Sequence, residues 1–386
     1  MAKLIRITTV PLSLNVLLPG QMRYMREQGM DVLMVAGEGP DWKEVLPREE
    51  CRHAIVPMSR KITPVADLKA LWQLYRLFKK EKPDIVHSHT PKAGLLAMLA
   101  AKMAGVKFRI HTIAGLRFMT AKGKTRKLLV AMEKLTARAA THVWPNSFSL
   151  RDYIVANKLV DPRKLEVIGL GSSNGINLKR YSPGALNASK LEEIKSALQY
   201  DPSLKYLVSV GRIVHDKGMD ELVKAFVQLS PDHPDVRLVL VGAFEDELDP
   251  VSDEAREILR THPQIIQVGW SDAVEYYMSL AFALIHPSHR EGFPNVLLQA
   301  GAMGCPVICS AIEGNVDIVT HGETGLLFPV KDAAALAAQV SVALADPAAL
   351  RQYAVNLRQK IESHFDQPVI HNLLHKRYMS LLQSGR

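Results

Sequence analysis

The 386-residue sequence has little cysteine, no long hydrophobic run and few aromatic side chains. Its three cysteines, Cys51, Cys305 and Cys309, are too few for a disulfide framework, which favours a reducing compartment. No run of about 18 apolar residues occurs, so no membrane span is predicted. Polar residues between Arg6 and Asn15 interrupt the basic, apolar N-terminus, which excludes a secretory signal core. We therefore expect a cytoplasmic protein.

Charge is divided unevenly along the chain. Residues 1–183 carry 31 Lys and Arg against 14 Asp and Glu, a net charge of +17, whereas residues 184–386 carry 17 against 25, a net charge of −8. This division indicates an anionic partner for the first half only, and nucleic acid, an anionic membrane or a lipid diphosphate would each qualify. Aromatic content is only 6% and no nucleic-acid motif occurs, so we expect no nucleic-acid partner.

Short apolar segments alternate with helical patterns throughout the chain, which is typical of parallel α/β sheets. The predicted strands are residues 3–10, 31–37, 84–89, 108–113 and 141–146 in the first half, and 205–211, 236–242, 265–269, 282–288 and 306–310 in the second. Residues 64–82 predict a helix that Thr63 caps, with Leu68, Leu71, Tyr75 and Phe78 at helical spacing. The Pro, Gly, Asn and Ser of YSPGALNAS place a domain boundary near residues 180–200.

The segment from Ser288 to Pro306, SHREGFPNVLLQAGAMGCP, combines a carboxylate with a helix start. Pro294 suits the first turn of a helix, where its missing N–H has no partner to lose. The backbone N–H groups that follow attract phosphate, whereas the carboxylate of Glu291 suits hydroxyl groups. The segment therefore predicts a site for a sugar attached to a diphosphate.

This segment resembles the donor-site motif of the retaining GT-B glycosyltransferases of family 4, in which seven residues separate two glutamates. Glu291 matches the first, which contacts donor-sugar hydroxyls, and Gln299 stands where the second binds ribose. The resemblance covers nearly the whole chain and implies two Rossmann-like domains facing across a cleft. It implies an acceptor-binding domain at 1–185, a nucleotide-sugar-binding domain at 186–366, and a last helix in 367–386 that returns to the first domain.

Two cations, Arg212 and Lys217, stand in a glycine-containing loop between a predicted strand and a helix. Alone they could be solvated loop residues, but matching residues of the family bind the donor diphosphate. No two aspartates are separated by one residue, so the Asp-any-Asp motif of metal-dependent transferases is absent, as are zinc-ligand spacings. We therefore expect these cations and the helix start at Pro294 to stabilise the leaving diphosphate without a metal ion.

Gln299 departs from the family pattern. A carboxylate accepts bonds from both ribose hydroxyls, whereas a carboxamide accepts at one end and donates at the other. We expect this to weaken donor binding by about 1–2 kcal/mol; otherwise the ribose is held differently or the nucleotide differs. The predicted site comprises Glu291 as the catalytic residue and Arg212, Lys217, Gly292, Phe293, Pro294, Asn295 and Gln299 as donor-binding residues. Trp270 and Asn315 fit either this site or a structural role.

The histidines of the first half do not support a histidine-based mechanism. His87 and His89 match a recurrent strand of the family, but strand-end histidines are more often structural. The family's Thr-any-His-Gly corresponds to residues 112–115, where Ala114 replaces the histidine, and His111 does not inherit its role by proximity. Bacterial members that extend polyprenyl-diphosphate-linked sugars also lack this histidine and carry a Gly-Leu pair like Gly115-Leu116. They also contain a segment similar in sequence to residues 171–183.

A basic cluster opens the helical pattern at residues 122–138. Its members are Lys122, Lys124, Arg126 and Lys127, and Leu128, Met132, Leu135 and Ala139 follow along one predicted face. Cations are unfavourable at a helix start, so an anionic membrane surface or a lipid diphosphate would explain them. A solvated basic loop is the alternative.

Together these features imply the function of the chain. We expect retaining transfer of a hexose or N-acetylhexosamine from a UDP-sugar to a polyprenyl-diphosphate-linked saccharide, without a metal ion, in bacterial surface-glycan assembly. The enzyme would lie in the cytoplasm, peripherally associated with the inner face of the cell membrane. The alternative is a catalytically silent nucleotide-sugar-binding subunit, which Gln299 and Ala114 favour and Arg212, Lys217 and Glu291 oppose.

Overall fold

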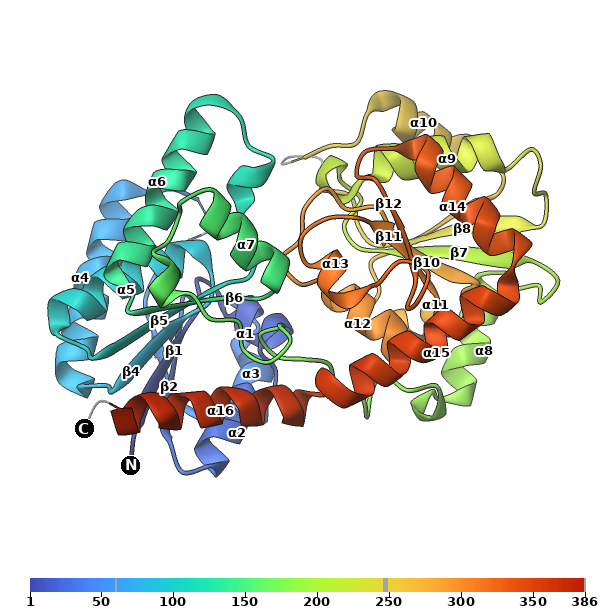
Figure 1. The fold of residues 1–386 in the computed structure, drawn as a ribbon. Coiled ribbons are helices and arrows are strands. Elements are labelled where there is room, and N and C mark those ends of the chain that lie inside the picture. Colours follow the sequence, from blue (N-terminus) through green and yellow to red (C-terminus); the bar gives the residue numbers. More distant parts are fainter. Residues whose placement is uncertain (60, 246–248, 385–386) are drawn as a thin grey trace. The chain divides into compact units, whose positions relative to one another are not determined.

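The computed structural model describes residues 1–59, 61–245 and 249–384, and the chain divides into two compact units (Figure 1). The first unit consists of Met1–Asn174 with Gln367–Arg386, and the second of Gly175–Asp366. Each contains a six-stranded sheet in which all paired strands run parallel. The α/β class and the two Rossmann-like units are therefore confirmed.

The sheet of the first unit has the strand order β3-β2-β1-β4-β5-β6. Its strands are β1 (Lys3–Ile7), β2 (Asp31–Ala36), β3 (Arg52–Ile55), β4 (Ile85–Ser88), β5 (Phe108–Ile113) and β6 (His142–Pro145). Its helices are α1 (Pro11–Leu17), α2 (Gln21–Glu27), α3 (Trp42–Glu49), α4 (Pro64–Glu81), α5 (Pro91–Ala104), α6 (Gly123–Ala139), α7 (Phe148–Ala156) and α16 (Gln367–Ser384).

The sheet of the second unit has the equivalent order, β12-β11-β10-β7-β8-β9. Its strands are β7 (Lys205–Val210), β8 (Val236–Val241), β9 (Ile265–Gly269), β10 (Ala283–His286), β11 (Val307–Ser310) and β12 (Leu326–Phe328). Its helices are α8 (Ala188–Ala197), α9 (Met219–Leu229), α10 (Asp253–Thr261), α11 (Val274–Leu280), α12 (Asn295–Ala302), α13 (Asn315–Ile318), α14 (Ala333–Ala345) and α15 (Pro347–His364). In both sheets the chain order reverses beside the first strand, which is where open parallel sheets bind ligands.

All ten predicted strands form, and two edge strands, β3 and β12, were not predicted. Arg52–Ile55 is mostly exposed and carries no apolar run, and Leu326–Phe328 has only three residues, so neither has a clear strand pattern. Edge strands need less apolar sequence because only one side is paired and their faces are less covered. These omissions leave the site-bearing strands unaffected.

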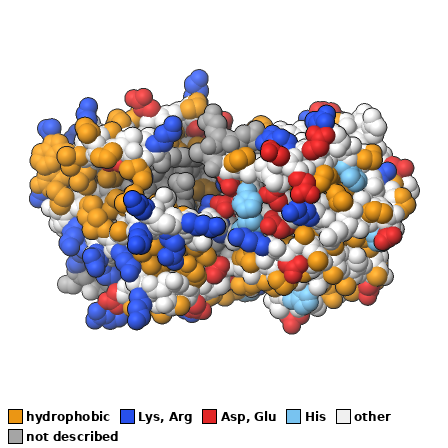
Figure 2. Space-filling model, turned by 90° about the horizontal axis from the view of Figure 1, so that it is seen from above, with side chains coloured by type: hydrophobic (Ala, Val, Ile, Leu, Met, Phe, Trp, Pro, Cys, Tyr) orange, Lys and Arg blue, Asp and Glu red, His pale blue; other side chains and the backbone are white. Residues whose placement is uncertain are grey.

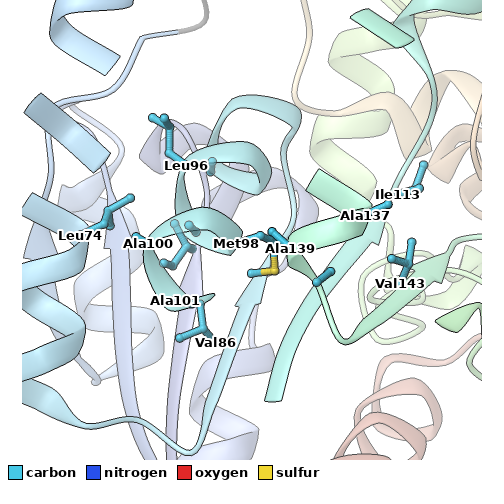
Figure 3. Packing of buried hydrophobic residues seen from close by; sticks show 14 of the residues in the cluster. Leu74, Val86, Leu96, Met98, Ala100, Ala101, Ile113, Ala137, Ala139 and Val143 are labelled. Carbon is cyan, nitrogen blue, oxygen red and sulfur yellow. The ribbon is translucent and has the colours of Figure 1, made fainter. Parts of the chain in front are cut away.

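Two apolar layers cover the first sheet. On one face α4, α5, α6 and α7 pack over the sheet, and Figure 3 shows part of this cluster, with Leu74, Leu96 and Ala137 from the helices and Val86 and Val143 from the strands. On the other face α1, α2, α3 and α16 form a second cluster. The predicted helix α4 forms, but its buried side chains are Ala70, Leu74 and Phe78, whereas Leu68 is 67% exposed.

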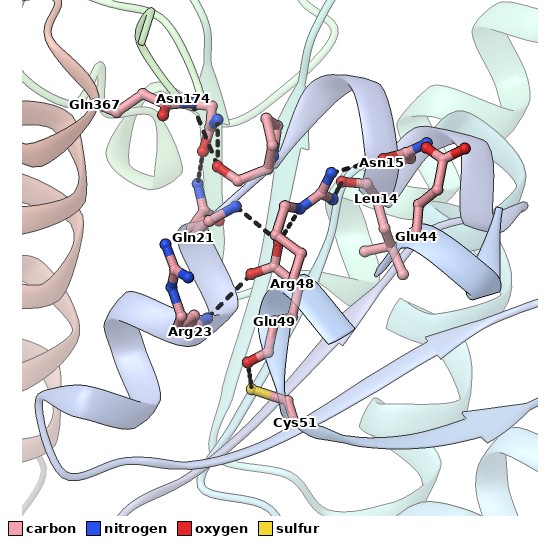
Figure 4. Close-up of polar contacts among 12 residues, drawn as sticks. Leu14, Asn15, Gln21, Arg23, Glu44, Arg48, Glu49, Cys51, Asn174 and Gln367 are labelled. Atoms are coloured by element: carbon pink, nitrogen blue, oxygen red, sulfur yellow. Dashed lines mark hydrogen bonds and ion pairs between the residues drawn. The ribbon is translucent and has the colours of Figure 1, made fainter. Parts of the chain in front are cut away.

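Helix α16 belongs to the first unit through specific contacts as well as apolar packing. Its Tyr378 hydroxyl lies 2.5 Å from His87 Nδ1, and its His371 Nε2 lies 2.8 Å from Asn174 Oδ1. Gln367 at its start donates to the carbonyl of Pro19 at 3.3 Å (Figure 4). These bonds connect the end of the chain to strand β4, to the loop before α2 and to Asn174.

The division between the units falls after Asn174, earlier than the predicted boundary at 185/186. Ile176 forms a parallel backbone bridge with Asp366, within the second unit. Arg180 makes an ion pair with Glu275 at 2.9 Å, so the segment that begins at Gly175 is already fixed to the second unit. The composition break at YSPGALNAS marks a loop on that unit rather than the division itself.

Among the described residues, no single helix is both long and apolar enough to cross a membrane. The helices α14 and α15, which meet at a bend of 101°, are together long and apolar enough to pass a membrane-span test by length and composition alone.

Candidate functional site

Two loops meet at the switch point of the second sheet and bring the predicted donor-binding residues together. Strands β7 and β10 are neighbours, with Leu207 opposite Ala283. Gly218, at the end of the loop after β7, has φ +69°, and a Cβ there would lie 2.1 Å from the carbonyl oxygen of Pro287 in the loop after β10. Only glycine fits such a close backbone approach with positive φ. The loop that holds Lys217 is therefore seated directly on the loop that leads to Glu291.

Lys217 and Glu291 form an ion pair at the centre of this arrangement, and both side chains are largely buried. His286 Nε2, from the end of β10, lies 3.3 Å from Glu291 Oε1. Burial by itself would raise the pKa of Glu291, but the Lys217 ammonium and His286 outweigh it and hold the pKa well below its usual value. Burial lowers the pKa of His286, which favours the neutral ring. Glu291 is therefore an ionised, oriented acceptor for hydroxyl groups.

Several contacts around this pair fix the two loops. Arg290 makes an ion pair with Asp216 at 2.8 Å, and the N–H of His289 donates to the carbonyl of Asp216 at 2.9 Å. Gly314 has φ +84°, and a Cβ there would lie 2.6 Å from the carbonyl oxygen of Gly292. The donor segment is thus supported from both sides by neighbouring backbone.

Arg212 follows β7 and is about half exposed, at 49% of its side chain. Its Nη1 lies 2.5 Å from Glu245 Oε2. The guanidinium is thus placed at the carboxyl end of the sheet, but a carboxylate already pairs with it. An incoming diphosphate would compete with Glu245 for this cation.

The start of α12 differs slightly from the prediction. Pro294 is the N-cap residue and the helix begins at Asn295, one residue later than predicted. The proline side chain cannot accept a bond, so it leaves the first N–H groups of the helix for another acceptor. The ring of Phe293 packs against Phe365 at 5.3 Å between centroids, so its side chain has a structural contact.

Gln299 lies on α12 and donates from Nε2 to the hydroxyl oxygen of Tyr181 at 2.8 Å. Tyr181 is buried, and burial is the main cause of its raised pKa. The bond fixes which end of the carboxamide faces the tyrosine and leaves Oε1 as the end that can accept from a ligand. Asn295 stands one turn earlier on the helix and is half-buried.

Trp270 and Asn315, whose roles the sequence left open, differ in burial. Trp270 is 75% exposed just after β9, which excludes the buried structural role. Asn315 is fully buried and donates from Nδ2 to the carbonyl of Ser310 at 2.9 Å, so its amide has a structural bond.

The three histidines that the sequence analysis considered in the first unit, His87, His89 and His111, are all buried. His87 Nε2 lies 2.7 Å from Thr112 Oγ1, and His111 Nδ1 lies 2.9 Å from Ser88 Oγ. Burial holds the pKa of His87 and His89 well below the ordinary value and lowers the pKa of His111 to about 4. These rings are neutral at pH 7. The hydrogen bonds of His87 and His111 support the structural interpretation, whereas the buried Nδ1 of His89 has no hydrogen-bond partner among the described residues.

The basic cluster lies at the start of α6, with Lys122 as the N-cap residue. Its four side chains, Lys122, Lys124, Arg126 and Lys127, are exposed. The predicted helix forms, and on its apolar face Leu128 and Leu135 are 49% and 43% exposed. The helix instead buries Thr136, Ala137 and Ala139.

Three contact residues of the site were not predicted from the sequence: His286, Tyr181 and Glu245. His286 stands five residues before Glu291 on a strand, so its side-chain direction depends on strand geometry. Tyr181 lies in the GINLKRYSP segment, which the sequence marked without assigning a partner. No local pattern links Glu245 to Arg212.

Comparisons with known proteins identify the family of this chain. Residues 191–361 match the family model described as "Glycosyl transferases group 1", and residues 16–171 match the "Glycosyl transferase 4-like domain". The "Capsular polysaccharide biosynthesis glycosyltransferase CapM" of Staphylococcus aureus is 34% identical over 99% of this chain and 98% of its own.

A second relative is the "UDP-Gal:alpha-D-GlcNAc-diphosphoundecaprenol alpha-1,3-galactosyltransferase" of Escherichia coli, 29% identical over 82% of this chain and 81% of its own. Among solved structures, Anabaena HepE in complex with UDP-glucose superposes with a TM-score of 0.80 at 17% identity, covering 98% of this chain and all (100%) of HepE. This likeness shows the fold. From the family matches and the full-length relative, the chain belongs to the glycosyltransferases of family 4, with the GT-B fold.

Proposed function

We propose that this glycosyltransferase moves a hexose or N-acetylhexosamine from a UDP-sugar to a polyprenyl-diphosphate-linked saccharide, with retention of anomeric configuration and without a metal ion. One observation carries the donor half of the proposal: Lys217, Glu291 and the start of α12 meet at the carboxyl ends of β7 and β10. The acceptor half is supported by the E. coli relative, whose name specifies a diphosphoundecaprenol-linked acceptor.

The arrangement suits departure of a nucleoside diphosphate. As the bond between the anomeric carbon and the diphosphate oxygen breaks, negative charge grows on the leaving oxygen. Lys217, Arg212 and the N–H groups at the start of α12 are donors that stabilise such charge, Arg212 once the diphosphate has displaced Glu245 from it. In this proposal the acceptor hydroxyl attacks from the same face and passes its proton to the departing phosphate oxygen.

Glu291 positions the donor sugar in this proposal. Its carboxylate is ionised and held by Lys217, with His286 Nε2 3.3 Å away, so it accepts bonds from sugar hydroxyls in one fixed orientation. Gln299 accepts from a ribose hydroxyl through Oε1 while Tyr181 holds its other end.

The first unit supplies a surface for an anionic membrane. Helix α4 exposes Val65, Leu68 and Trp72, at 87%, 67% and 54%, along one side. Figure 2 shows hydrophobic side chains gathered on the surface of the first unit, with Lys and Arg beside them. Exposed apolar side chains with cations around them bind membrane interfaces, and the basic cluster of α6 adds to this. We propose peripheral association with the inner face of the cell membrane.

The activity test uses the whole protein, a panel of UDP-sugars and a polyprenyl-diphosphate-linked saccharide, in the presence of a chelator. We expect one donor to give a lengthened lipid-linked product with the donor's anomeric configuration. Tight UDP binding with neither transfer nor hydrolysis would favour the silent subunit instead. Absence of turnover by a folded protein with every donor would refute the proposal.

Membrane association is tested separately by flotation with vesicles that contain or lack anionic lipid. The variant Trp72→Ser should reduce vesicle binding, whereas Trp270→Ser, the same change at an exposed tryptophan of the second unit, should not. Equal loss in both variants would contradict the placement of the membrane surface on α4.

A further inference from the structure

Arg6 lies in the middle of the first unit and has no counter-charge among the described residues. It is 1% exposed on β1. Its Nε donates to Gln21 Oε1 at 3.1 Å and its Nη1 to the carbonyl of His87 at 3.4 Å, both neutral acceptors. Arginine stays protonated in proteins, so a full positive charge is enclosed here.

Two other buried charges of the first unit are paired, which sets Arg6 apart from them. Glu49 accepts from Arg48 at 2.8 Å and from the N–H groups of Gly20 and Arg23 (Figure 4). Lys92 pairs with Asp67 at 2.7 Å. An unpaired buried charge is costly, so proteins rarely keep one without a compensating group.

A second observation points to what compensates Arg6. Two buried donors, Arg6 Nη2 and Trp144 Nε1, have no hydrogen-bond partner among the described residues. Both residues line one small cavity of about 20 Å³. Other lining residues include His87 and Thr112 from the sheet and Ile370 and Leu374 from α16. The cavity thus combines a positive charge with two donors that lack an acceptor.

We propose that this cavity binds a monatomic anion, with chloride as the abundant candidate. Its volume of about 20 Å³ is enough for one particle of about the size of a water molecule, which a halide ion matches. A halide would accept from Arg6 and Trp144 and neutralise the enclosed charge. Because α16 supplies part of the wall, and Tyr378 of α16 bonds to His87 beside Arg6, the anion stabilises the seating of α16 on the first unit. This site is separate from the donor site and independent of the proposed function.

The first test is crystallographic. Crystals of the whole protein are grown or soaked in sodium bromide, and anomalous scattering is measured at the bromine edge. We expect a bromide peak in the cavity between Arg6 and Trp144. Density there without anomalous signal would identify water and overturn the proposal.

The second test measures thermal unfolding in sodium chloride and in sodium gluconate at equal ionic strength, since gluconate is too large for the cavity. We expect chloride to raise the midpoint by roughly 2–4 °C. A bromide peak without this chloride dependence would mean binding at crystal concentration only, and would overturn the stabilising role.

Variants assign the effect to the cavity. Arg6→Met should abolish the chloride dependence, whereas Arg163→Met, at a side chain that is 89% exposed, should retain it. If Arg6→Met fails to fold, Trp144→Phe keeps an aromatic ring while removing the indole donor, and should reduce the chloride shift. An undiminished shift in Trp144→Phe would contradict the assignment.

Discussion

Replacing Gln299 by glutamate changes the donor site at a single, well-defined contact. In the native chain Gln299 Nε2 donates to the Tyr181 hydroxyl oxygen at 2.8 Å. A carboxylate at this position accepts from the same hydroxyl, since a tyrosine O–H donates as readily as it accepts. Both carboxylate oxygens then remain acceptors, so a second ribose hydroxyl gains a partner.

The expected gain follows from the difference between two kinds of hydrogen bond. A bond to a charged group contributes about 1.5–3 kcal/mol and a neutral one about 0.5–1.5 kcal/mol. The exchange should therefore tighten UDP binding by about 1–2 kcal/mol, roughly five- to thirtyfold. Tyr181→Phe, which removes the hydroxyl that holds the carboxamide, should weaken binding of UDP a few-fold.

Isothermal titration with UDP measures these affinities for the native chain and the variants Gln299→Glu and Tyr181→Phe. Gln228→Glu, the same change at an exposed position of α9, controls for the added charge and should leave the affinity unaltered. If Gln299→Glu weakens UDP binding or leaves it unchanged, the assignment of this position to the ribose is wrong.

Three further substitutions test the loops around the site. Lys217→Met should weaken UDP binding by about 2 kcal/mol, roughly thirtyfold, because one charge-assisted contact is lost and Glu291 loses its counter-charge; titration that finds native affinity would exclude contact with the diphosphate. Glu245→Gln should tighten UDP binding a few-fold, because it frees Arg212 from its ion pair, and the gain should disappear in an Arg212→Met background. Gly218→Ala should lower the unfolding midpoint and the UDP affinity together, because the positive φ of +69° and the nearby carbonyl of Pro287 leave no room for a methyl group; an unchanged midpoint would show that the loops separate easily.

The fold was predictable because its signals are local. Most central strands are short and rich in apolar residues, such as Val236–Val241, and the glycines and prolines between them mark the turns. Edge strands carry weaker patterns, which is why β3 was missed. The predicted boundary at 185/186 falls after the observed division at Asn174 because a loop's composition does not reveal which unit its side chains contact, as the pair Arg180–Glu275 illustrates.

The donor segment was predictable because Glu291, Pro294 and Gln299 lie within one short run. The contacts of that segment were not, since His286, Tyr181 and Glu245 reach it from other elements. Exposure was also difficult to predict on amphipathic helices. Leu68 and Leu128 have helical spacing, but spacing alone does not tell which stripe of the helix meets the sheet.

The burial of Arg6 on β1 was also not predictable from the sequence. Arg6 stands among apolar residues in the sequence, where a single charge is easily assigned to solvent. Only the neighbouring strands and α16 reveal that it is enclosed, with Trp144 beside the same cavity.

The most direct test of the central claim is a crystal structure of the whole protein with an intact UDP-sugar. We predict the diphosphate at the carboxyl ends of β7 and β10, in contact with Lys217 and Arg212, with the sugar at Glu291 and the ribose at Gln299. A diphosphate bound away from Lys217 and the start of α12 would contradict the account.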